Sequence, residues 1–353
     1  MRDVVSDAIA AVRIGQPFSE RVRVGGRWCA RLDPYDGAGF HVVLRGSCWL
    51  LPDGGEPVVL GAGDAVLLPH GTGHVIADAP ADAATVARAV SFARWADENL
   101  PRPPRAYDDA SETAAPWPGA PYDGVSETAA PWPGAPYDDA SEAVAREIGG
   151  PHDGAREVEM LCGKYRLDRS HAHPLLAELP PLVHLPGHGG GPELRAAIGL
   201  LGGELDARRP GSSLALPSLL DLLFVYMIRS WMAGSTAGGW PAVLGDPVAA
   251  AALRALHSDP AAPWTVDRLA AEAGVSRPTL ARRFTALVGR PPMAYLTWWR
   301  LTRAAALLRD TREPLATVAR RVGYASPYAL SHAFRREFGT TPGRYRNDPV
   351  TSD

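Results

Sequence analysis

Two stretches near the end of the chain repeat one pattern: Trp264-Thr-Val-Asp-Arg-Leu-Ala-Ala-Glu-Ala-Gly-Val-Ser-Arg-Pro-Thr-Leu-Ala-Arg-Arg-Phe284 and Leu315-Ala-Thr-Val-Ala-Arg-Arg-Val-Gly-Tyr-Ala-Ser-Pro-Tyr-Ala-Leu-Ser-His-Ala-Phe334. In each, an alanine is followed four residues later by a glycine (Gly274, Gly323) and then by a serine (Ser276, Ser326). The glycine suits a helix end that needs a positive φ, and the serine suits the N-cap of the next helix. The pattern predicts two helix-turn-helix units, whose second helices are the elements that such motifs place in a DNA major groove.

The distribution of charge supports a DNA-binding role for this region. Residues 246–346 contain 16 arginines and 7 acidic residues, which gives +9, whereas the whole chain carries −3 and the remainder therefore −12. A basic domain on an acidic body is typical of a protein that binds a polyanion. An amphipathic helix is expected at residues 291–310, between the two units. Its apolar face contains Tyr295, Leu296, Trp299, Leu301, Leu307 and Leu308.

The second unit runs into Phe334-Arg-Arg-Glu-Phe-Gly-Thr-Thr-Pro-Gly-Arg-Tyr-Arg346, and a degenerate copy at 284–295 ends the first. On these residues the chain resembles the AraC/XylS family of bacterial transcription regulators. The resemblance implies a sequence-specific DNA-binding domain at 246–346, with double-stranded DNA and RNA polymerase as partners. By family position, the groove-facing residues are Pro278, Ala281, Arg282, Pro327, Tyr328, Ser331 and His332. Arg277 and Thr279 lie beside the first set, and Ser326 lies at the start of the second recognition helix.

Polar readout in the first recognition helix falls mainly to Arg282, because proline and alanine have no side-chain donor. Phosphate contacts are expected from Arg283, Arg335, Arg336, Arg344 and backbone amides at helix N-termini.

The first part of the chain has the pattern of an antiparallel barrel or sandwich. Short apolar runs separated by Gly, Pro and Asp occur between residues 20 and 95, and Glu157–Leu167 alternates like a returning strand. Gly63-Asp-Ala-Val-Leu-Leu-Pro-His-Gly-Thr-Gly-His74 resembles the second cupin motif, and Phe40-His-Val-Val-Leu-Arg-Gly46 resembles the end of the first. The His-x-His pair is absent, and Gly39 stands where glutamate is expected. The resemblance thus implies a cupin-like sensor barrel at 1–190 more than a cupin enzyme.

Two further segments complete the organisation. Residues 107–151 hold a proline-rich tandem repeat that includes Trp117 and Trp132, and this composition predicts a flexible insertion. Residues 191–240 are expected to form a helical dimerisation segment and linker, with a hinge at Gly234–Pro241, because Leu219–Met232 is apolar almost all round. The predicted fold class is α+β, with an N-terminal cupin-like barrel and an all-α C-terminal domain, in a homodimer.

Three residues are candidates for an effector or metal site. His41 and His74 are predicted to bind an effector inside the barrel, and together with Cys162 they form a His₂Cys set that suits zinc-like divalent metals. Simple packing of these residues and a thiol sensor remain alternatives, and Cys29 and Cys48 are possible neighbours across strands. His70, His171 and His173 are expected in loops. No catalytic residue stands out, so the protein is expected not to be an enzyme, with a cupin-type metalloenzyme as the remote alternative.

Three cysteines leave one unpaired in any disulfide scheme, which favours reduced thiols. Neither an apolar run of membrane-spanning length nor a signal pattern is visible. We therefore expect a cytoplasmic protein without a membrane partner.

Overall fold

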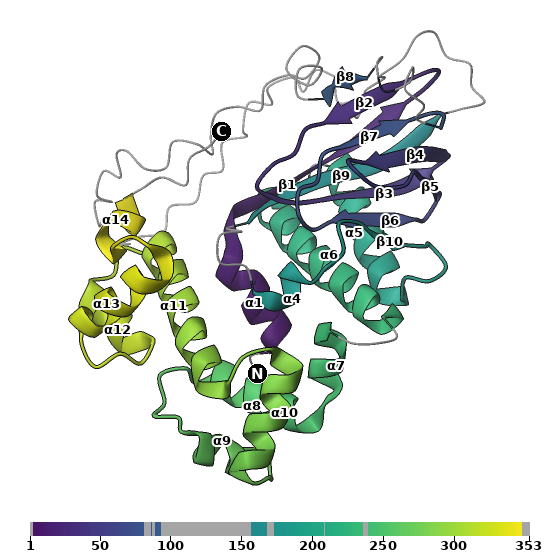
Figure 1. Cartoon of the computed structure of the whole chain (residues 1–353). Coiled ribbons are helices and arrows are strands. Elements are labelled where there is room, and N and C mark those ends of the chain that lie inside the picture. Colours follow the sequence, from purple (N-terminus) through teal and green to yellow (C-terminus); the bar gives the residue numbers. More distant parts are fainter. Residues whose placement is uncertain are drawn as a thin grey trace, which may run out of the picture.

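The computed structural model describes residues 3–80, 86, 89–92, 157–167, 173–207, 209–235 and 239–347. A sheet-rich N-terminal part is followed by a helical C-terminal part, which confirms the predicted α+β class (Figure 1). The tandem repeat with Trp117 and Trp132 lies outside the described residues, as does His171.

Ten strands form two five-stranded sheets in the described part of the chain. The first sheet contains, in spatial order, β1 (Arg13–Val24), β9 (Val158–Leu167), β3 (Gly37–Arg45), β6 (Ala65–Leu68) and β10 (Val183–Leu185). The second contains β5 (Val58–Gly61), β4 (Ser47–Pro52), β7 (His74–Ala77), β2 (Cys29–Leu32) and β8 (Val90–Ser91). The returning strand predicted at 157–167 is confirmed as β9, whereas β7 was not predicted.

The two sheets form an open sandwich rather than a closed barrel, and the sequence pattern allowed either arrangement. Closing a sheet requires a continuous hydrogen-bond ladder around the ring. The edge strands β8 and β10 have only 2 and 3 residues, and no described pairing joins the two sheets. The pairing is antiparallel except between β2 and β8, which run parallel.

The first sheet is buried on both faces. Successive residues of a strand point to opposite sides, so Val43 of β3 packs between the sheets while Phe40 and Val42 pack against helices. These helices are α1 (Val4–Val12), α4 (Pro174–Ala177), α5 (Pro192–Ala207) and α6 (Ser212–Gly234). On this side the hydroxyl of Tyr165 donates a hydrogen bond of 2.6 Å to the carbonyl of Leu220. Helix α1 was not predicted from the sequence.

Helix α6 is long and apolar enough to cross a membrane by length and composition alone, with a mean hydropathy of 1.4 over its most apolar window. Core helices of soluble proteins pass the same test. Here α6 packs against α5 and β1, and its Asp221 forms an ion pair with Arg13.

The C-terminal part contains α7 (Gly239–Gly245), α8 (Pro247–Ser258), α9 (Val266–Glu272), α10 (Arg277–Val288), α11 (Pro292–Asp310), α12 (Leu315–Arg321), α13 (Pro327–Phe338) and α14 (Pro342–Asn347). Gly274 and Gly323 adopt φ values of +66° and +85°. The hydroxyls of Ser276 and Ser326 accept hydrogen bonds from the backbone N–H groups of Thr279 and Ala329. Both predicted helix-turn-helix units are therefore confirmed, as is the connecting helix.

Candidate nucleic-acid interface and buried pocket

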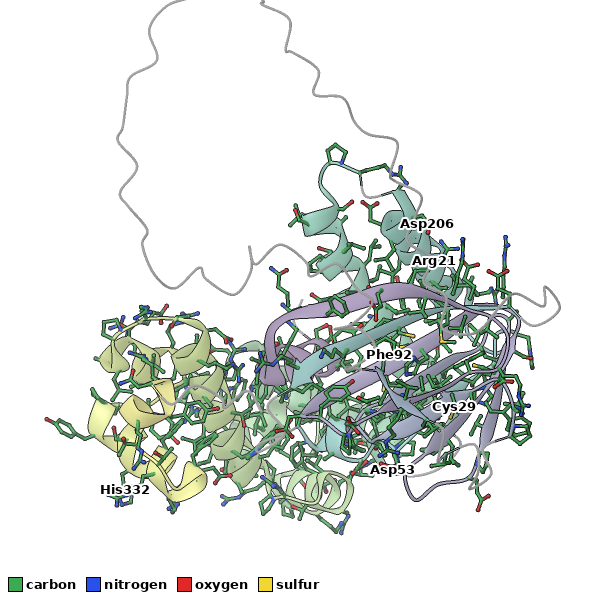
Figure 2. All side chains as sticks on the ribbon, turned by 90° about the horizontal axis from the view of Figure 1, so that it is seen from above. Arg21, Cys29, Asp53, Phe92, Asp206 and His332 are labelled. Atoms are coloured by element: carbon green, nitrogen blue, oxygen red, sulfur yellow. The ribbon has the colours of Figure 1, made fainter. Side chains whose placement is uncertain are left out.

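The two recognition helices, α10 and α13, each bury one apolar stripe and leave the opposite side to solvent. Leu280 and Phe284 of α10 are buried, and Leu330 and Phe334 of α13 occupy the matching positions. Every predicted DNA-contacting residue of these helices is exposed or half-buried. Tyr328 is 86 % exposed, and His332 projects from the far end of the helical part (Figure 2). The helices therefore present the side that the sequence predicts to face DNA.

Two of the predicted DNA-contacting arginines already have acidic partners. Arg283 forms an ion pair of 2.6 Å with Asp246, which also caps α8, and Arg277 lies 3.2 Å from Asp267. Arg282 is exposed and forms no ion pair within the described residues. Contact with phosphate by Arg283 would need exchange of its carboxylate partner, whereas Arg282 needs no such exchange.

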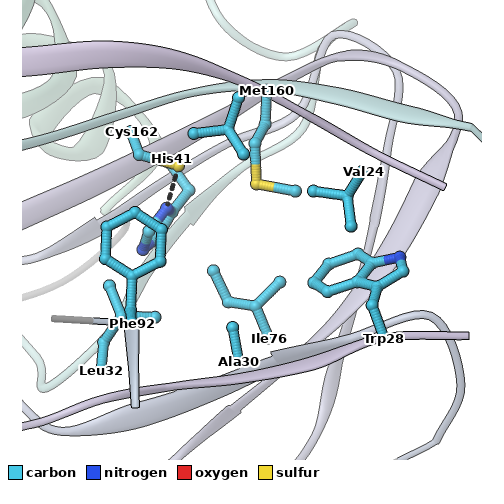
Figure 3. A pocket seen from close by; sticks show the side chains of 10 residues that line it. Val24, Trp28, Ala30, Leu32, His41, Ile76, Phe92, Met160 and Cys162 are labelled. Carbon is cyan, nitrogen blue, oxygen red and sulfur yellow. Dashed lines mark hydrogen bonds between the residues drawn. The ribbon is translucent and has the colours of Figure 1, made fainter. Parts of the chain in front are cut away.

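The predicted histidine and cysteine candidates come together between the two sheets, and Figure 3 shows the contact between His41 and Cys162. His41 of β3 lies 2.8 Å, Nε2 to Nε2, from His74 at the start of β7, and its Nδ1 lies 3.1 Å from Sγ of Cys162 on β9. The pairing of β3 with β9 places His41 directly opposite Cys162. The sequence thus identified a real cluster.

Hydrogen bonding fixes the direction of each proton in this cluster. The Thr72 carbonyl can only accept, so Nδ1 of His74 donates to it over 2.9 Å. The Nε2 atom of a neutral His74 must then accept from Nε2–H of His41, and Nδ1 of His41 accepts from the Cys162 thiol. A directed relay therefore runs from Cys162 through His41 to His74 and Thr72, which we call the pocket relay.

Burial keeps all members of the pocket relay uncharged. It holds the pKa of His41 well below its ordinary value, with the neighbouring His74 adding to the effect. The pKa of His74 falls to about 4 because the ring is buried. Burial also raises the pKa of the Cys162 thiol well above its usual range. At neutral pH the relay carries no net charge.

A small apolar cavity lies beside the relay. Its volume is about 20 Å³, and ten residues line it: Val22, Val24, Trp28, Ala30, Leu32, His41, Ile76, Phe92, Met160 and Cys162. The Trp28 indole N–H is buried and has no hydrogen-bond partner among the described residues. Trp28, Met160 and Phe92 were not among the predicted site residues. Met160 lies two residues before Cys162 on β9, so the alternation of the strand places these two side chains on the same face.

The donor geometry does not suit a three-ligand metal site. Both nitrogens of His41 are engaged, one towards Cys162 and one towards His74, and a single ion cannot coordinate both nitrogens of one imidazole. Among the described residues no group of three or more His, Cys, Asp or Glu side chains is arranged to hold a metal ion.

The predicted neighbourhood of Cys29 and Cys48 is wrong. Strand β7 lies between β2, which carries Cys29, and β4, which carries Cys48. The two thiols also belong to different core clusters. All three cysteines are free of disulfide bonds.

Comparison with known proteins agrees with the two-part organisation. A family model described as Cupin matches residues 3–233, and one described as Helix-turn-helix domain matches residues 269–348. Two proteins described as AraC-like transcription regulators, from Streptomyces lividans and Streptomyces antibioticus, are each 34% identical over 99% of this chain and 99% of their own. The chain belongs to the AraC family of transcription regulators.

One solved structure similar to this AraC-family regulator is that of the DNA-binding domain of AdpA, described as a global transcriptional factor, in complex with a target DNA. It is 39% identical, the match covers 29% of this chain and 90% of that chain, and the TM-score is 0.27.

The comparisons confirm the predicted family and its character as a DNA-binding transcription regulator with a cupin domain. The relatives are named as regulators rather than as enzymes. The individual base and phosphate contacts stay predictions, as do the effector and metal roles of His41, His74 and Cys162.

The structure adds one histidine to the buried polar residues. His173 lies outside helices and strands, as predicted, but its side chain is completely buried at the N-cap of α4. Its partners come from distant parts of the chain, so no local pattern could have identified it.

Proposed function

We propose that this AraC-family regulator is controlled by a small, uncharged, largely apolar effector that binds between the two sheets beside the pocket relay. The observation that carries the proposal is an apolar cavity whose lining includes His41 and Cys162, two residues in contact with each other. Ligand sites commonly combine an apolar wall with a few placed polar groups. The neutral relay and the apolar wall disfavour a charged ligand, because neither would compensate its desolvation.

The small size of the cavity suggests how binding would affect the rest of the protein. A water molecule requires roughly 10–15 Å³ of cavity volume, so a cavity of about 20 Å³ holds little more than one water molecule. A ligand of several heavy atoms must displace Met160, Phe92 or the strands behind them. Because a ligand shifts an equilibrium only by its differential affinity for the two states, this expansion is the event that would be linked to DNA binding.

Thermal shift of the full-length protein tests the effector site. The probes are uncharged alcohols, ketones and aromatic hydrocarbons, each paired with a carboxylate of similar size. We expect stabilisation by some neutral probes only, loss of it in His74→Ala and in the cavity-filling Ala30→Leu, and retention in His184→Ala on the edge strand β10. Stabilisation that survives both pocket variants would place the ligand elsewhere.

Zinc is the second candidate effector. Elemental analysis of purified protein should find no stoichiometric zinc if the pocket relay is as described, because zinc binding needs the His41 to His74 hydrogen bond to open. Stoichiometric zinc that disappears in His74→Ala would favour the metal and overturn the neutral-ligand proposal. A thiol sensor requires an accessible thiolate, which the raised pKa of Cys162 disfavours.

The DNA-binding part would read two successive major grooves. Because α11 joins α10 and α13 in one unit, their contacts should be separated by about one helical turn, roughly 10 base pairs. Footprinting on DNA selected by the full-length protein checks this spacing. A footprint without that periodicity contradicts the geometry.

The helices α5 and α6 supply a surface for a homodimer. Leu200 of α5 and Leu214 and Leu222 of α6 are 60 %, 77 % and 38 % exposed, although all three are large apolar side chains. Exposed apolar clusters mark interaction sites in soluble proteins. Sedimentation should show a dimer that Leu214→Glu weakens. Cytoplasmic location and contact with RNA polymerase follow from the family as further expectations.

A further inference from the structure

The first helix-turn-helix half, which we define as α7 to α10 with the N-terminal part of α11, carries an aromatic socket. Trp240 of α7 and three residues of α11, Tyr295, Trp298 and Trp299, surround the ring of His173. Ring centroids lie 4.8 Å from His173 for Trp240 and 5.4 Å for Trp298. His173 itself belongs to the sensor domain, at the N-cap of α4. A side chain of one domain thus fills a socket of the other.

A second buried relay passes through this socket, and its proton directions follow from its ends. The backbone N–H of Leu175 donates to Nδ1 of His173, so a neutral His173 carries its proton on Nε2. This Nε2–H donates to the Tyr295 hydroxyl over 2.9 Å. The hydroxyl in turn donates to Nε2 of His257 over 2.8 Å.

Asp7 of α1 completes this socket relay. Its carboxylate accepts from Nδ1–H of His257 over 3.1 Å and lies 3.8 Å from the guanidinium of Arg303 on α11. Every polar atom of the two imidazoles and of the Tyr295 hydroxyl is therefore matched, with donor and acceptor alternating. Buried polar groups that are fully matched specify one arrangement, because any displacement leaves unpaired groups without water.

Two further bonds hold the same pair of surfaces together. The Glu178 carboxylate, just after α4, accepts from the backbone N–H of Trp240 over 3.0 Å. The Arg309 guanidinium of α11 donates to the carbonyl of Ala11, in the last turn of α1, over 3.3 Å. Figure 1 shows α1 and α4 lying between the sheets and the helices α8 and α11.

Helix α1 also continues directly into the sheet that forms the pocket wall. It ends at Val12, and β1 begins at Arg13 and pairs with β9, the strand that carries Met160 and Cys162. The chain therefore runs from Asp7 in α1 directly into β1, whose far end supplies Val22 and Val24 to the pocket wall.

We propose that the socket relay seats the first helix-turn-helix half on the sensor domain in a fixed orientation, so that α10 moves with the sensor while α13 follows only through α11. The inference concerns how the domains are joined and does not depend on the identity, or existence, of an effector.

Hydrogen exchange measured by mass spectrometry on the full-length protein tests this inference. Tyr295→Phe keeps the ring in place and removes only the shared hydroxyl, which leaves Nε2–H of His173 and Nε2 of His257 unpaired in a buried site. His173→Asn keeps an N-cap side chain for α4 but empties the socket. In both variants we expect amide exchange in α1, α4 and α8 to rise at least about tenfold, with α12 and α13 unchanged.

The matched control is Tyr165→Phe. This change also deletes one buried hydroxyl, but its hydrogen bond to Leu220 lies entirely within the sensor domain. We expect faster exchange in β9 and α6 only. If Tyr295→Phe fails to fold, His173→Asn decides. Exchange in α1 and α8 that rises no more than in Tyr165→Phe, or an equal rise in α12 and α13, overturns the proposal.

Discussion

The two helix-turn-helix halves have the same local pattern but different places in the molecule. The first half shares one continuous core with the sensor domain: Phe284, Tyr295 and Trp299 belong to the same cluster as α1, α6 and the outer face of the first sheet. The second half has its own core around Leu301, Leu308 and Phe334. Equal sequence patterns therefore produce equal helices, while tertiary packing decides which half shares its core with the sheet-rich part of the chain.

The largest expected effect comes from removing the equivalent phenylalanine of each half. Phe284 and Phe334 are both completely buried, and truncation of such a ring costs about 3–5 kcal/mol. Phe334→Ala should unfold the second half locally and leave the sensor and first half intact. Phe284→Ala should lower the stability of the sensor and the first half together. Hydrogen exchange on both variants checks this, and a global loss from Phe334→Ala would contradict the separation of the two cores.

Acid should distinguish the two regions next. The sensor and first half bury four neutral imidazoles, His41, His74, His173 and His257, whose pKa values all lie below the ordinary 6.5. The only histidine in residues 301–346 is His332, which is exposed. These four imidazoles therefore bind protons more readily in the unfolded chain than in the folded one.

The sign and size of this effect follow from linkage. A histidine with a depressed folded pKa contributes no pH dependence above about 6.5, and stability falls as pH drops below that value. For His74 alone, the pKa falls from 6.5 to about 4 on folding. At about 1.4 kcal/mol per pH unit, this difference lowers the free energy of unfolding by roughly 3 kcal/mol as the pH falls from 6.5 to 4. Unfolding followed at pH 7 and pH 5.5 should show the loss in the sensor and first half. His74→Gln should flatten the dependence, and an equal loss in α12 and α13 would count against this account.

The features that the sequence predicted correctly are those set by residues close to one another in the chain. Gly274, Ser276, Gly323 and Ser326 act within a few residues of themselves, so the local pattern predicted both turns. The cupin-like motifs made His41 and His74 candidates and strand alternation added Cys162, but whether the three side chains meet depends on how the two sheets pack.

What the sequence could not supply depends on contacts between distant segments. The socket relay joins Asp7, His173, His257 and Tyr295 through bonds between residues 38, 122 and 250 positions apart, which no local pattern reveals. The separation of Cys29 from Cys48 depends on the spatial order of strands, which no alternation pattern reveals. The open sandwich likewise depends on how short the edge strands are.

Base specificity should depend on Arg282 more than on its neighbour Arg283. Arg282→Ala should cost roughly 1–3 kcal/mol on the preferred DNA and relax specificity at one position. Arg283→Ala should weaken binding to all sequences by a smaller amount, because Arg283 gives up its Asp246 partner when it contacts phosphate. Affinities for the selected DNA and for single-base variants check this. A uniform loss from Arg282→Ala would make Arg282 a phosphate contact instead.

The smallest expected effect is on the salt dependence of binding by the second half. Arg335 and Arg336 are exposed on the last turn of α13, and each phosphate contact contributes about one unit to the slope of log affinity against log salt. The double change Arg335→Gln and Arg336→Gln should therefore flatten the slope by about two while leaving the preferred sequence unchanged. A matched change of Arg312→Gln, in the segment between α11 and α12, serves as a charge control. If Arg312→Gln flattens the slope equally, the arginines of α13 contribute only through their general charge. Arg335 and Arg336 then do not contact the DNA phosphates beside the groove that the recognition residues of α13 enter.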